Sequence, residues 1–224
     1  MIVIDLGLSV NWAECNLGAN SPLDCGNYYS WGEIHPKSKF TETSNRFYSG
    51  ALDFLPIDDI DSDYYNIDYR NNNMYIKYNS KDGKRVLEME DDAAQTFLGN
   101  CWKIPNQEDW QELVDCCDWI WLENQKGYQI ISRKNGNSIL LPITGYYFLD
   151  VFEIFWGLEN DLKDDQIGFY WTSQLHLSKH LQFKNSFSIY TNAITFSFNK
   201  TCLHFKEMNR AVGVPIRPVQ VPLH

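Results

Sequence analysis

The chain has 224 residues, of which 44% are hydrophobic and 15% are aromatic, and its formal net charge at pH 7 is −10. This apolar content predicts a folded domain with a sizeable core and excludes a disordered chain. The acidic balance argues against nucleic acid as a partner, because neutralising phosphates supplies most of that affinity. No apolar run reaches about 18 residues, so we expect no direct insertion into a membrane.

The first part of the chain predicts short strands and then a long irregular excursion. The N-terminus has neither a basic n-region nor a long apolar stretch, so we expect no signal peptide in this chain. Residues 2–19 predict a strand, a turn and a second strand, and residues 26–33 predict an extended, packed turn. Residues 37–85 predict a long excursion with one strand pair, near 74–78 and 84–89.

Two helices are predicted in the middle of the chain. Residues 91–98 predict a short helix that Gly99 ends, since glycine tolerates the backbone conformation of a helix stop. Asn106, directly after Pro105, is a good N-cap for a second helix whose first turn is acidic. One apolar face follows at i, i+3, i+4 and i+7, formed by Trp110, Leu113, Val114 and Cys117.

The remainder of the chain predicts β-structure. Residues 127–133 and 138–142 flank Asn135–Gly136, a pair typical of a type I′ turn, in which both central residues need positive φ. A loop region with an acidic patch at 161–165 follows. Two helices enclosed by strands predict an α+β domain in which strands from the two termini pair. Further strands are predicted over residues 168–173, 181–190, 193–199, 202–205 and 211–218.

Several blocks of this sequence, in this order along the chain, resemble the Fibrobacter succinogenes major paralogous domain family. They include residues 5–19, Gly26-Asn-Tyr-Tyr-Ser-Trp-Gly-Glu33, Trp102-Lys-Ile-Pro105, Asn135-Gly-Asn-Ser-Ile-Leu-Leu-Pro142, Tyr170-Trp-Thr-Ser173 and Ile216-Arg-Pro-Val219. The resemblance implies a single C-type-lectin-like domain over residues 1–224, related to formylglycine-generating-enzyme-like domains. In that fold two helices flank antiparallel β-sheets and the termini pair. Long insertions are expected at about 41–85 and 148–167.

The resemblance also bears on function and location. Family members generally have no known catalytic activity and are found in envelope or secreted proteins of gut bacteria. The resemblance therefore implies a non-enzymatic recognition module for a glycan or a protein. It implies the cell surface or secretion, if an upstream signal has been removed. Two alternatives stay open: a structural or assembly component, such as a fibre or adhesin subunit, and an enzyme of the formylglycine-generating type.

Aromatic side chains are the candidate ligand-binding residues. Tyrosine and tryptophan give a large contact area at low entropic cost, and they stack on sugar rings or fill protein pockets. The candidates in the loop-rich C-terminal half are Tyr146, Tyr147, Phe148, Phe152, Trp156 and Tyr190. The tryptophans inside the family blocks are instead predicted to be core: Trp12, Trp31, Trp102, Trp110 and Trp171. Arg217 is predicted to be a structural arginine that pairs with a buried carboxylate.

No metal ion, cofactor or catalytic residue is predicted. A D-x-D-x-D run lies within residues 58–63, but Tyr64 and Arg70 stand where a calcium-binding EF-hand loop needs Gly and Glu. If calcium binds, this run or the group Asp161, Asp164 and Asp165 is where we expect it. His176 and His180 have the spacing of a helical metal pair, but they follow a strand and lack the glutamate of a zinc protease.

The six cysteines are scattered and contain no C-x-x-C motif, which favours buried free thiols. Cys202 lies late in the chain, as the redox cysteines of formylglycine-generating enzymes do. It has His204 nearby but no second cysteine at a matched spacing. Cys117 is interpreted as a core residue or as a disulfide partner of Cys15.

Overall fold

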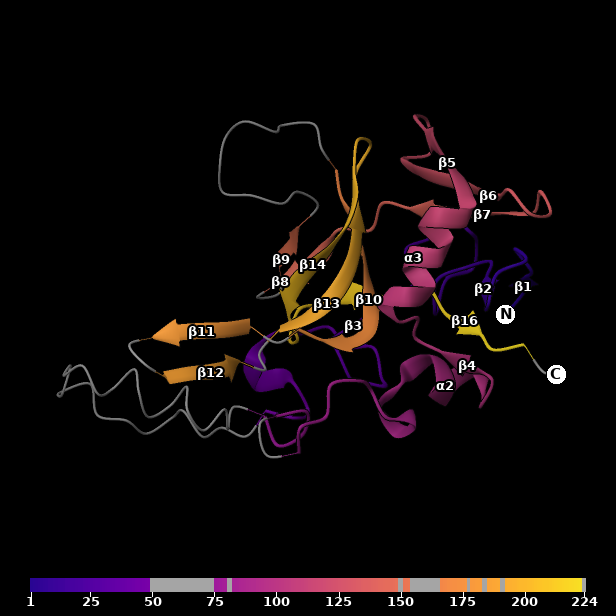
Figure 1. Cartoon of the computed structure of the whole chain (residues 1–224). Coiled ribbons are helices and arrows are strands. Elements are labelled where there is room, and N and C mark those ends of the chain that lie inside the picture. Colours follow the sequence, from indigo (N-terminus) through magenta and orange to yellow (C-terminus); the bar gives the residue numbers. More distant parts are fainter. Residues whose placement is uncertain are drawn as a thin grey trace.

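The computed structural model describes residues 1–48, 75–79, 82–148, 151–153, 166–176, 178–182, 185–189 and 192–222. Over these residues the chain is an α+β fold, with two α-helices and strands that pair antiparallel (Figure 1). Neither helix is long and apolar enough to span a membrane. The acidic patch at 161–165, the run at 58–63 and most of both expected insertions lie outside the described residues.

One sheet joins the two ends of the chain, as the sequence predicted (Figure 1). Val219 pairs with Trp12 on one side and with Lys103 on the other, so the last strand lies inside this sheet. The pairing of the termini is therefore confirmed. In spatial order the strands are β1 (Val3–Ile4), β2 (Asn11–Ala13), β16 (Val219–Gln220) and β4 (Trp102–Lys103).

A second sheet consists of β10, β13 and β14, in that order, and beside it β11 and β12 form a ribbon (Figure 1). The predicted strand over 181–190 is divided between two strands, β11 and β12, which pair antiparallel with each other. The predicted strand over 202–205 extends to Asn209. The bounds are β10 (Gly168–Leu175), β11 (Ser178–Gln182), β12 (Asn185–Ile189), β13 (Asn192–Phe198) and β14 (Leu203–Asn209).

Three smaller sheets complete the described β-structure. They are β5 (Cys117–Leu122), β6 (Gly127–Ser132) and β7 (Ser138–Pro142); β8 (Tyr146–Phe148) and β9 (Val151–Glu153); and β3 (Tyr28–Tyr29) with β15 (Val214–Pro215). The predicted hairpin around Asn135–Gly136 is present, but its type I′ turn is wrong. Gly136 has φ 77° whereas Asn135 has no positive φ. Ser132 instead closes a longer loop with Asn137, through a 2.9 Å bond from the Ser132 N–H.

Both predicted helices form, with the predicted stop at Gly99 and the predicted N-cap at Asn106, but the first begins two residues later than predicted. α2 (Ala93–Leu98) is capped by Asp92 and stops at Gly99, which has φ 99°. It is preceded by a 3-10 turn, η2 (Met89–Asp91), and another such turn, η1 (Glu42–Ser44), lies earlier in the chain. α3 (Gln107–Cys116) begins with a capping box in which Asn106 and Asp109 bond each other's backbone N–H groups.

The apolar face of α3 is shorter than predicted. The helix ends at Cys116, and Cys117 is already extended as the first residue of β5. The aromatic and β-branched residues that follow favour a strand, and this preference overrides the helical spacing. Cys117 is still buried in the core, and all six cysteines are free thiols. The disulfide alternative with Cys15 is therefore not formed. Of the six, only Cys15 and Cys117 are buried, so the expectation of buried thiols holds for two.

The five tryptophans predicted to be core are all buried, which confirms that prediction. Trp110 on α3 stacks on Phe196 of β13, with ring centroids 4.5 Å apart, and meets the edge of Trp12 at 4.7 Å. These contacts join the terminal sheet, α3 and the β10–β13–β14 sheet in one apolar cluster.

The predicted strand pair near 74–78 and 84–89 is wrong. Tyr75 bridges to Tyr48, and Val86 bridges to Gln174 of β10. The reason is a turn at Tyr78, which has φ 57° and whose N–H donates to the Asp82 carboxylate at 2.7 Å. This turn directs the two segments to different partners.

Arg217 is fully buried, as expected of a structural arginine, but its predicted carboxylate partner is wrong. Its Nε donates to the Asn16 side-chain oxygen at 2.7 Å. Its terminal nitrogens donate to the carbonyl oxygens of Ala13, Glu14 and Leu140 at 2.6 to 3.0 Å. Burial lowers the pKa of the guanidinium. The charge is thus held by an amide and three carbonyl groups, which fasten the C-terminal segment to the N-terminal one and to β7.

Candidate functional site

The predicted aromatic candidates are only partly available for a ligand. Tyr146 packs against the core, with its ring 5.3 Å from Phe169. Phe148 is exposed at the end of β8. Phe152 pairs with Tyr147 through the β8–β9 ladder. The Phe152 side chain, Trp156 and Tyr190 lie outside what the structure describes.

Tyr147 is held between two other rings. It stacks on Phe40 at 5.6 Å and meets Tyr28 edge-on at 4.8 Å. Its backbone also exchanges two hydrogen bonds with Gly213, of 2.8 and 2.9 Å. Tyr147 therefore anchors the β8–β9 hairpin to the body of the domain. Of the three candidates whose side chains are described, Phe148 alone is exposed.

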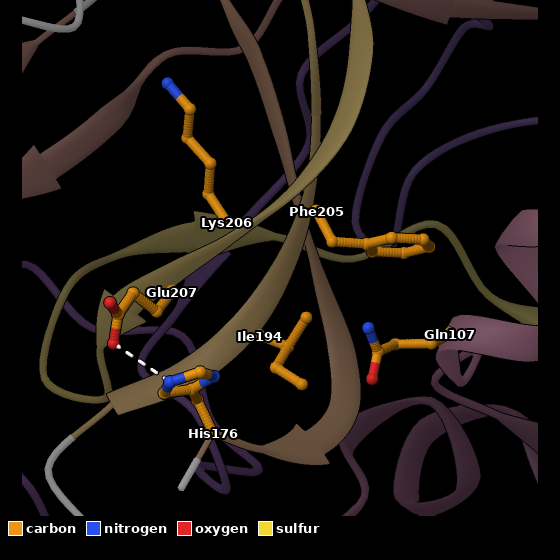
Figure 2. Close-up of a pocket in the computed structure, with 6 residues that line it drawn as sticks. All are labelled: Gln107, His176, Ile194, Phe205, Lys206 and Glu207. Carbon is orange, nitrogen blue, oxygen red and sulfur yellow. Dashed lines mark ion pairs between the residues drawn. The ribbon is translucent and has the colours of Figure 1, made fainter. Parts of the chain in front are cut away.

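A cleft of about 440 Å³ lies on the β10–β13–β14 sheet, beside the start of α3 (Figure 2). We call it the sheet cleft. It is lined by Gln107, His176, Ile194, Phe205, Lys206 and Glu207. These residues come from α3, from the residue that follows β10 and from β13 and β14, so the cleft exists only once the sheet and the helix have come together.

The floor of the sheet cleft is apolar because α3 covers only part of the sheet. Strand alternation puts Ile194 and Phe196 on one face of β13, opposite Glu207 and Phe205 of β14. Trp110 covers Phe196, but α3 begins only three residues earlier and leaves Ile194 partly exposed. The Phe205 ring contacts the Phe196 ring, with centroids 5.6 Å apart, and this contact holds Phe205 at the edge of the area that α3 covers.

Two polar groups face each other across Ile194 (Figure 2). On one side, the Gln107 amide points toward Ile194, while the Gln107 N–H is fixed by a 2.7 Å bond to the Gln174 side-chain oxygen. On the other side, His176 Nε2 lies 3.3 Å from the Glu207 carboxylate. The Glu207 carboxylate also accepts a 3.1 Å bond from the Asn192 amide.

Lys206 contributes little charge to the sheet cleft. Its side chain points away from the other five residues (Figure 2), as expected from its pairing with Thr195 on the opposite face. Burial lowers the pKa of its ammonium. The groups that face the cleft are thus an amide, an imidazole and a carboxylate over an apolar floor. This combination of an apolar surface with a few oriented polar groups is that of a small-ligand site.

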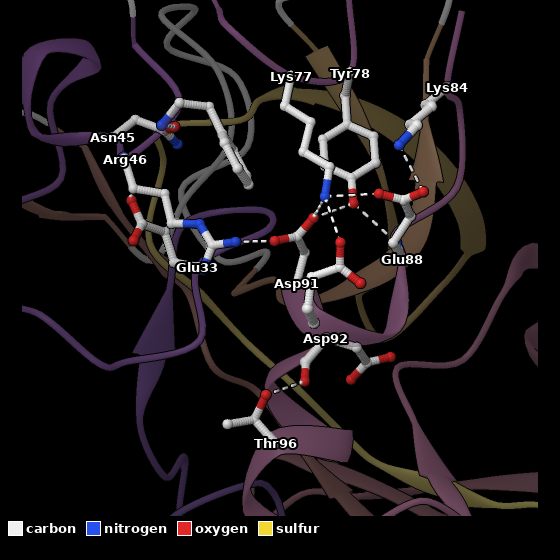
Figure 3. Close-up of polar contacts among 12 residues, drawn as sticks. Glu33, Asn45, Arg46, Lys77, Tyr78, Lys84, Glu88, Asp91, Asp92 and Thr96 are labelled. Carbon is white, nitrogen blue, oxygen red and sulfur yellow. Dashed lines mark hydrogen bonds and ion pairs between the residues drawn. The ribbon is translucent and has the colours of Figure 1, made fainter. Parts of the chain in front are cut away.

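A second cluster has the composition of a metal site but is already neutralised. The carboxylates of Glu88, Glu90 and Asp91 lie within 4.8 Å of one another. The Lys77 ammonium contacts all three, at 2.7, 2.9 and 2.5 Å (Figure 3). It occupies the position that a cation would take. We therefore interpret this cluster as a structural ion-pair network.

This network connects the two described segments that precede and follow residues 49–74. Asp91 is buried and accepts hydrogen bonds from Arg46, on one side of these residues, and from Tyr78, on the other (Figure 3). A salt bridge this well shielded, with several donors on one carboxylate, is costly to break.

Arg210 is a buried residue that the sequence did not point to. Its guanidinium lies 3.9 Å from the centre of the Tyr75 ring and donates to the carbonyl oxygens of Lys77 and Tyr78. Burial lowers its pKa to about 10. The available sequence signal was its position directly before the apolar run 211–214, because a charged residue next to a buried segment is carried toward the core with it. The Trp31, Phe47 and Tyr78 rings also surround it, at 5.1 to 5.8 Å.

Searches with this chain against protein-family models, curated proteins and solved structures gave no match. The family resemblance accordingly stays a prediction.

Of the cysteine and histidine considered for catalysis, Cys202 directly precedes β14 and His204 is its second residue. The Cys202 thiol is exposed and its sulfur lies 3.2 Å from the Asn199 side-chain oxygen. Burial lowers the pKa of His204, whose Nε2 has no hydrogen-bond partner among the described residues. The sequence predicted no metal site at His176 and His180. His176 contacts the Glu207 carboxylate, and the side chain of His180 lies outside what the structure describes.

Sequence reasoning missed most of the sheet cleft. The alternation over residues 194–198 was recognised as a half-buried strand, and this was the signal for an apolar face. The alternation did not indicate how much of this face of β13 would be covered by α3. Gln107 was visible only as the residue after an N-cap.

Proposed function

We propose that this chain is a non-enzymatic ligand-recognition domain with a C-type-lectin-like architecture, belonging to a bacterial surface or secreted protein. The paired termini, the two helices and the antiparallel sheets agree with the fold that the family resemblance implies. The proposal places the ligand, a glycan or a protein, at the sheet cleft.

The observation that carries this proposal is the arrangement around Ile194. An apolar floor left open by α3 is bordered by Gln107 on one side and by the His176–Glu207 pair on the other. The Glu207 carboxylate is held by His176 and Asn192, and the Gln107 backbone is held by Gln174, so much of the site is ordered before a ligand binds.

The test is a parallel screen of the whole chain against a glycan array and against a protein extract of the bacterial environment. We expect hits that are lost in Phe205→Ala, while thermal unfolding shows that this variant is folded. Hits that survive Phe205→Ala but are lost in Phe148→Ala would contradict the proposal, since they would move the binding surface to the β8–β9 hairpin.

An assembly role is the second candidate, and one observation favours it. β11 and β12 form a two-stranded sheet of their own that projects from β10 and β13 (Figure 1). A two-stranded ribbon is marginally stable alone, so an added strand from another subunit would stabilise it. Stable oligomers on a sizing column that dissociate when residues 178–189 are replaced by a short turn would favour this role. A turnover that depends on the exposed Cys202 would favour the enzyme alternative.

A further inference from the structure

We infer that the ligand of the sheet cleft is a neutral sugar ring, which lies with one apolar face on Ile194 and Phe205. This inference rests on the proposed recognition function and narrows it from a glycan or a protein to one ligand chemistry. Three properties of the cleft support it: the shape of its floor, the kind of polar groups at its rim and its charge.

The floor suits a ring with an apolar face. Ile194 and Phe205 lie on adjacent strands and on the same side of the sheet, and both are partly exposed. The C–H groups on one face of a pyranose pack on such a surface, and aromatic rings supply most of the contact area. The ring of Phe205 is already oriented by its contact with Phe196, so binding need not order it.

The rim suits hydroxyl groups. A sugar hydroxyl is both a donor and an acceptor, and it is satisfied best between groups of both kinds. The Gln107 amide offers two N–H donors and one carbonyl acceptor, and it points over the floor (Figure 2). Across from it, the Glu207 carboxylate is an acceptor and the His176 imidazole provides ring nitrogens. Hydroxyls on opposite sides of one ring would therefore meet polar partners on both rims.

The charge of the cleft favours a neutral ligand. His176 and Glu207 lie against each other, and the Lys206 ammonium is directed away. An anionic sugar would meet the Glu207 carboxylate and a protein of net charge −10, and Lys206, the one lysine among the described lining residues, is not directed at it.

The size of the cleft favours a small ligand over a protein surface. Its volume of about 440 Å³ falls in the range of roughly 300–1,000 Å³ that is typical of small-molecule sites. A stable protein complex needs about 1,000 Å² or more of buried interface, most of which would lie outside these six residues.

The experiment measures binding of the whole chain to an array that carries neutral glycans, sialylated and uronic-acid glycans, and peptides. Neutral hits are then titrated against four variants. Phe205→Ala removes the floor, and Gln107→Ala removes one rim while leaving the backbone bond to Gln174 intact. The matched controls are Phe97→Ala, an exposed phenylalanine on α2, and Gln111→Ala, one turn further along α3.

We expect neutral glycans to bind, with affinity roughly 10-fold or more lower in Phe205→Ala and Gln107→Ala and unchanged in both controls. Because Gln107 has no role in the core, Gln107→Ala keeps the test decisive if Phe205→Ala fails to fold. Peptides or acidic glycans that bind and are lost in the same two variants would overturn the sugar inference and leave the recognition function standing. Ligands whose affinity is equal in all four variants would overturn both. An array without a neutral hit would also overturn the inference.

Discussion

Trp110 of α3 and Phe196 of β13 stack with centroids 4.5 Å apart and ring planes only 9° from parallel. This contact fixes α3 on the β10–β13–β14 sheet. The position of α3 determines how much of that face it covers, and the sheet cleft lies on the part that stays uncovered. One residue pair thus connects the packing of the core with the candidate binding surface.

The stack leads to a prediction about stability. Trp110→Ala removes a fully buried ring, so we expect the free energy of unfolding to fall by about 3–5 kcal/mol. Urea unfolding followed by circular dichroism measures this change. The control is Phe97→Ala, which removes a half-exposed ring and should cost within about 0.5 kcal/mol. Equal losses in the two variants would show that the stack does not organise the core.

Arg210 gives a second prediction. Arg210→Lys keeps the charge but removes the planar guanidinium that stacks on Tyr75 and reaches two carbonyl oxygens. We expect the free energy of unfolding to fall by about 1.5–3 kcal/mol, the usual contribution of hydrogen bonds made by a charged group. Arg85→Lys, at an exposed arginine, should leave the unfolding midpoint unchanged. A wild-type midpoint in Arg210→Lys would contradict the anchoring role.

The third prediction concerns acid. Hydrogen bonds from Lys77 and then Lys84 lower the pKa of Glu88 from 4.5 to about 2. Because the folded pKa lies below the unfolded one, Glu88 stabilises the fold above pH 4.5, and this contribution is lost as pH falls toward 2. We expect the urea midpoint to drop across that window, and to drop less in Glu88→Gln. Parallel pH curves for the two proteins would rule this out.

The segment of the chain between Tyr48 and Tyr75 gives a fourth prediction. These two residues bridge directly, and Asp91 and Arg210 hold segments on both sides of it. Replacing residues 50–73 by a short Gly/Ser linker should therefore leave the cooperative unfolding transition in urea intact, because closing a short flexible loop costs little entropy. Loss of the cooperative transition would mean that the described fold depends on residues 50–73.

Sequence reasoning succeeded where the signal is local. The cap at Asn106 and the helix stop at Gly99 depend on backbone chemistry within a few residues, and both form as predicted. The pairing of the terminal strands is long-range, and it was predicted from the enclosure of helices by strands and from the family resemblance. The α+β fold class followed from the same features.

It failed where tertiary partners decide. A carboxylate partner was predicted for Arg217, but its partners include three backbone carbonyl groups. Every residue has a backbone carbonyl, so the sequence alone cannot indicate which of them bind the guanidinium. Cys117 kept helical spacing yet became the first residue of a strand, because pairing with β6 outweighs periodicity. The ring contacts of Tyr147 with Phe40 and Tyr28 were likewise not predicted, because both partners are more than a hundred residues away in the sequence.

The central claim is that the sheet cleft is the ligand site, and titration of the best array hit into wild-type chain and Gln107→Ala tests it most directly. Gln107 borders the cleft and lies outside the buried core, so a change in affinity reports on the site rather than on folding. The account predicts that affinity falls roughly 10-fold or more in Gln107→Ala while Gln111→Ala keeps the wild-type value. Equal affinity in wild type and Gln107→Ala would contradict it.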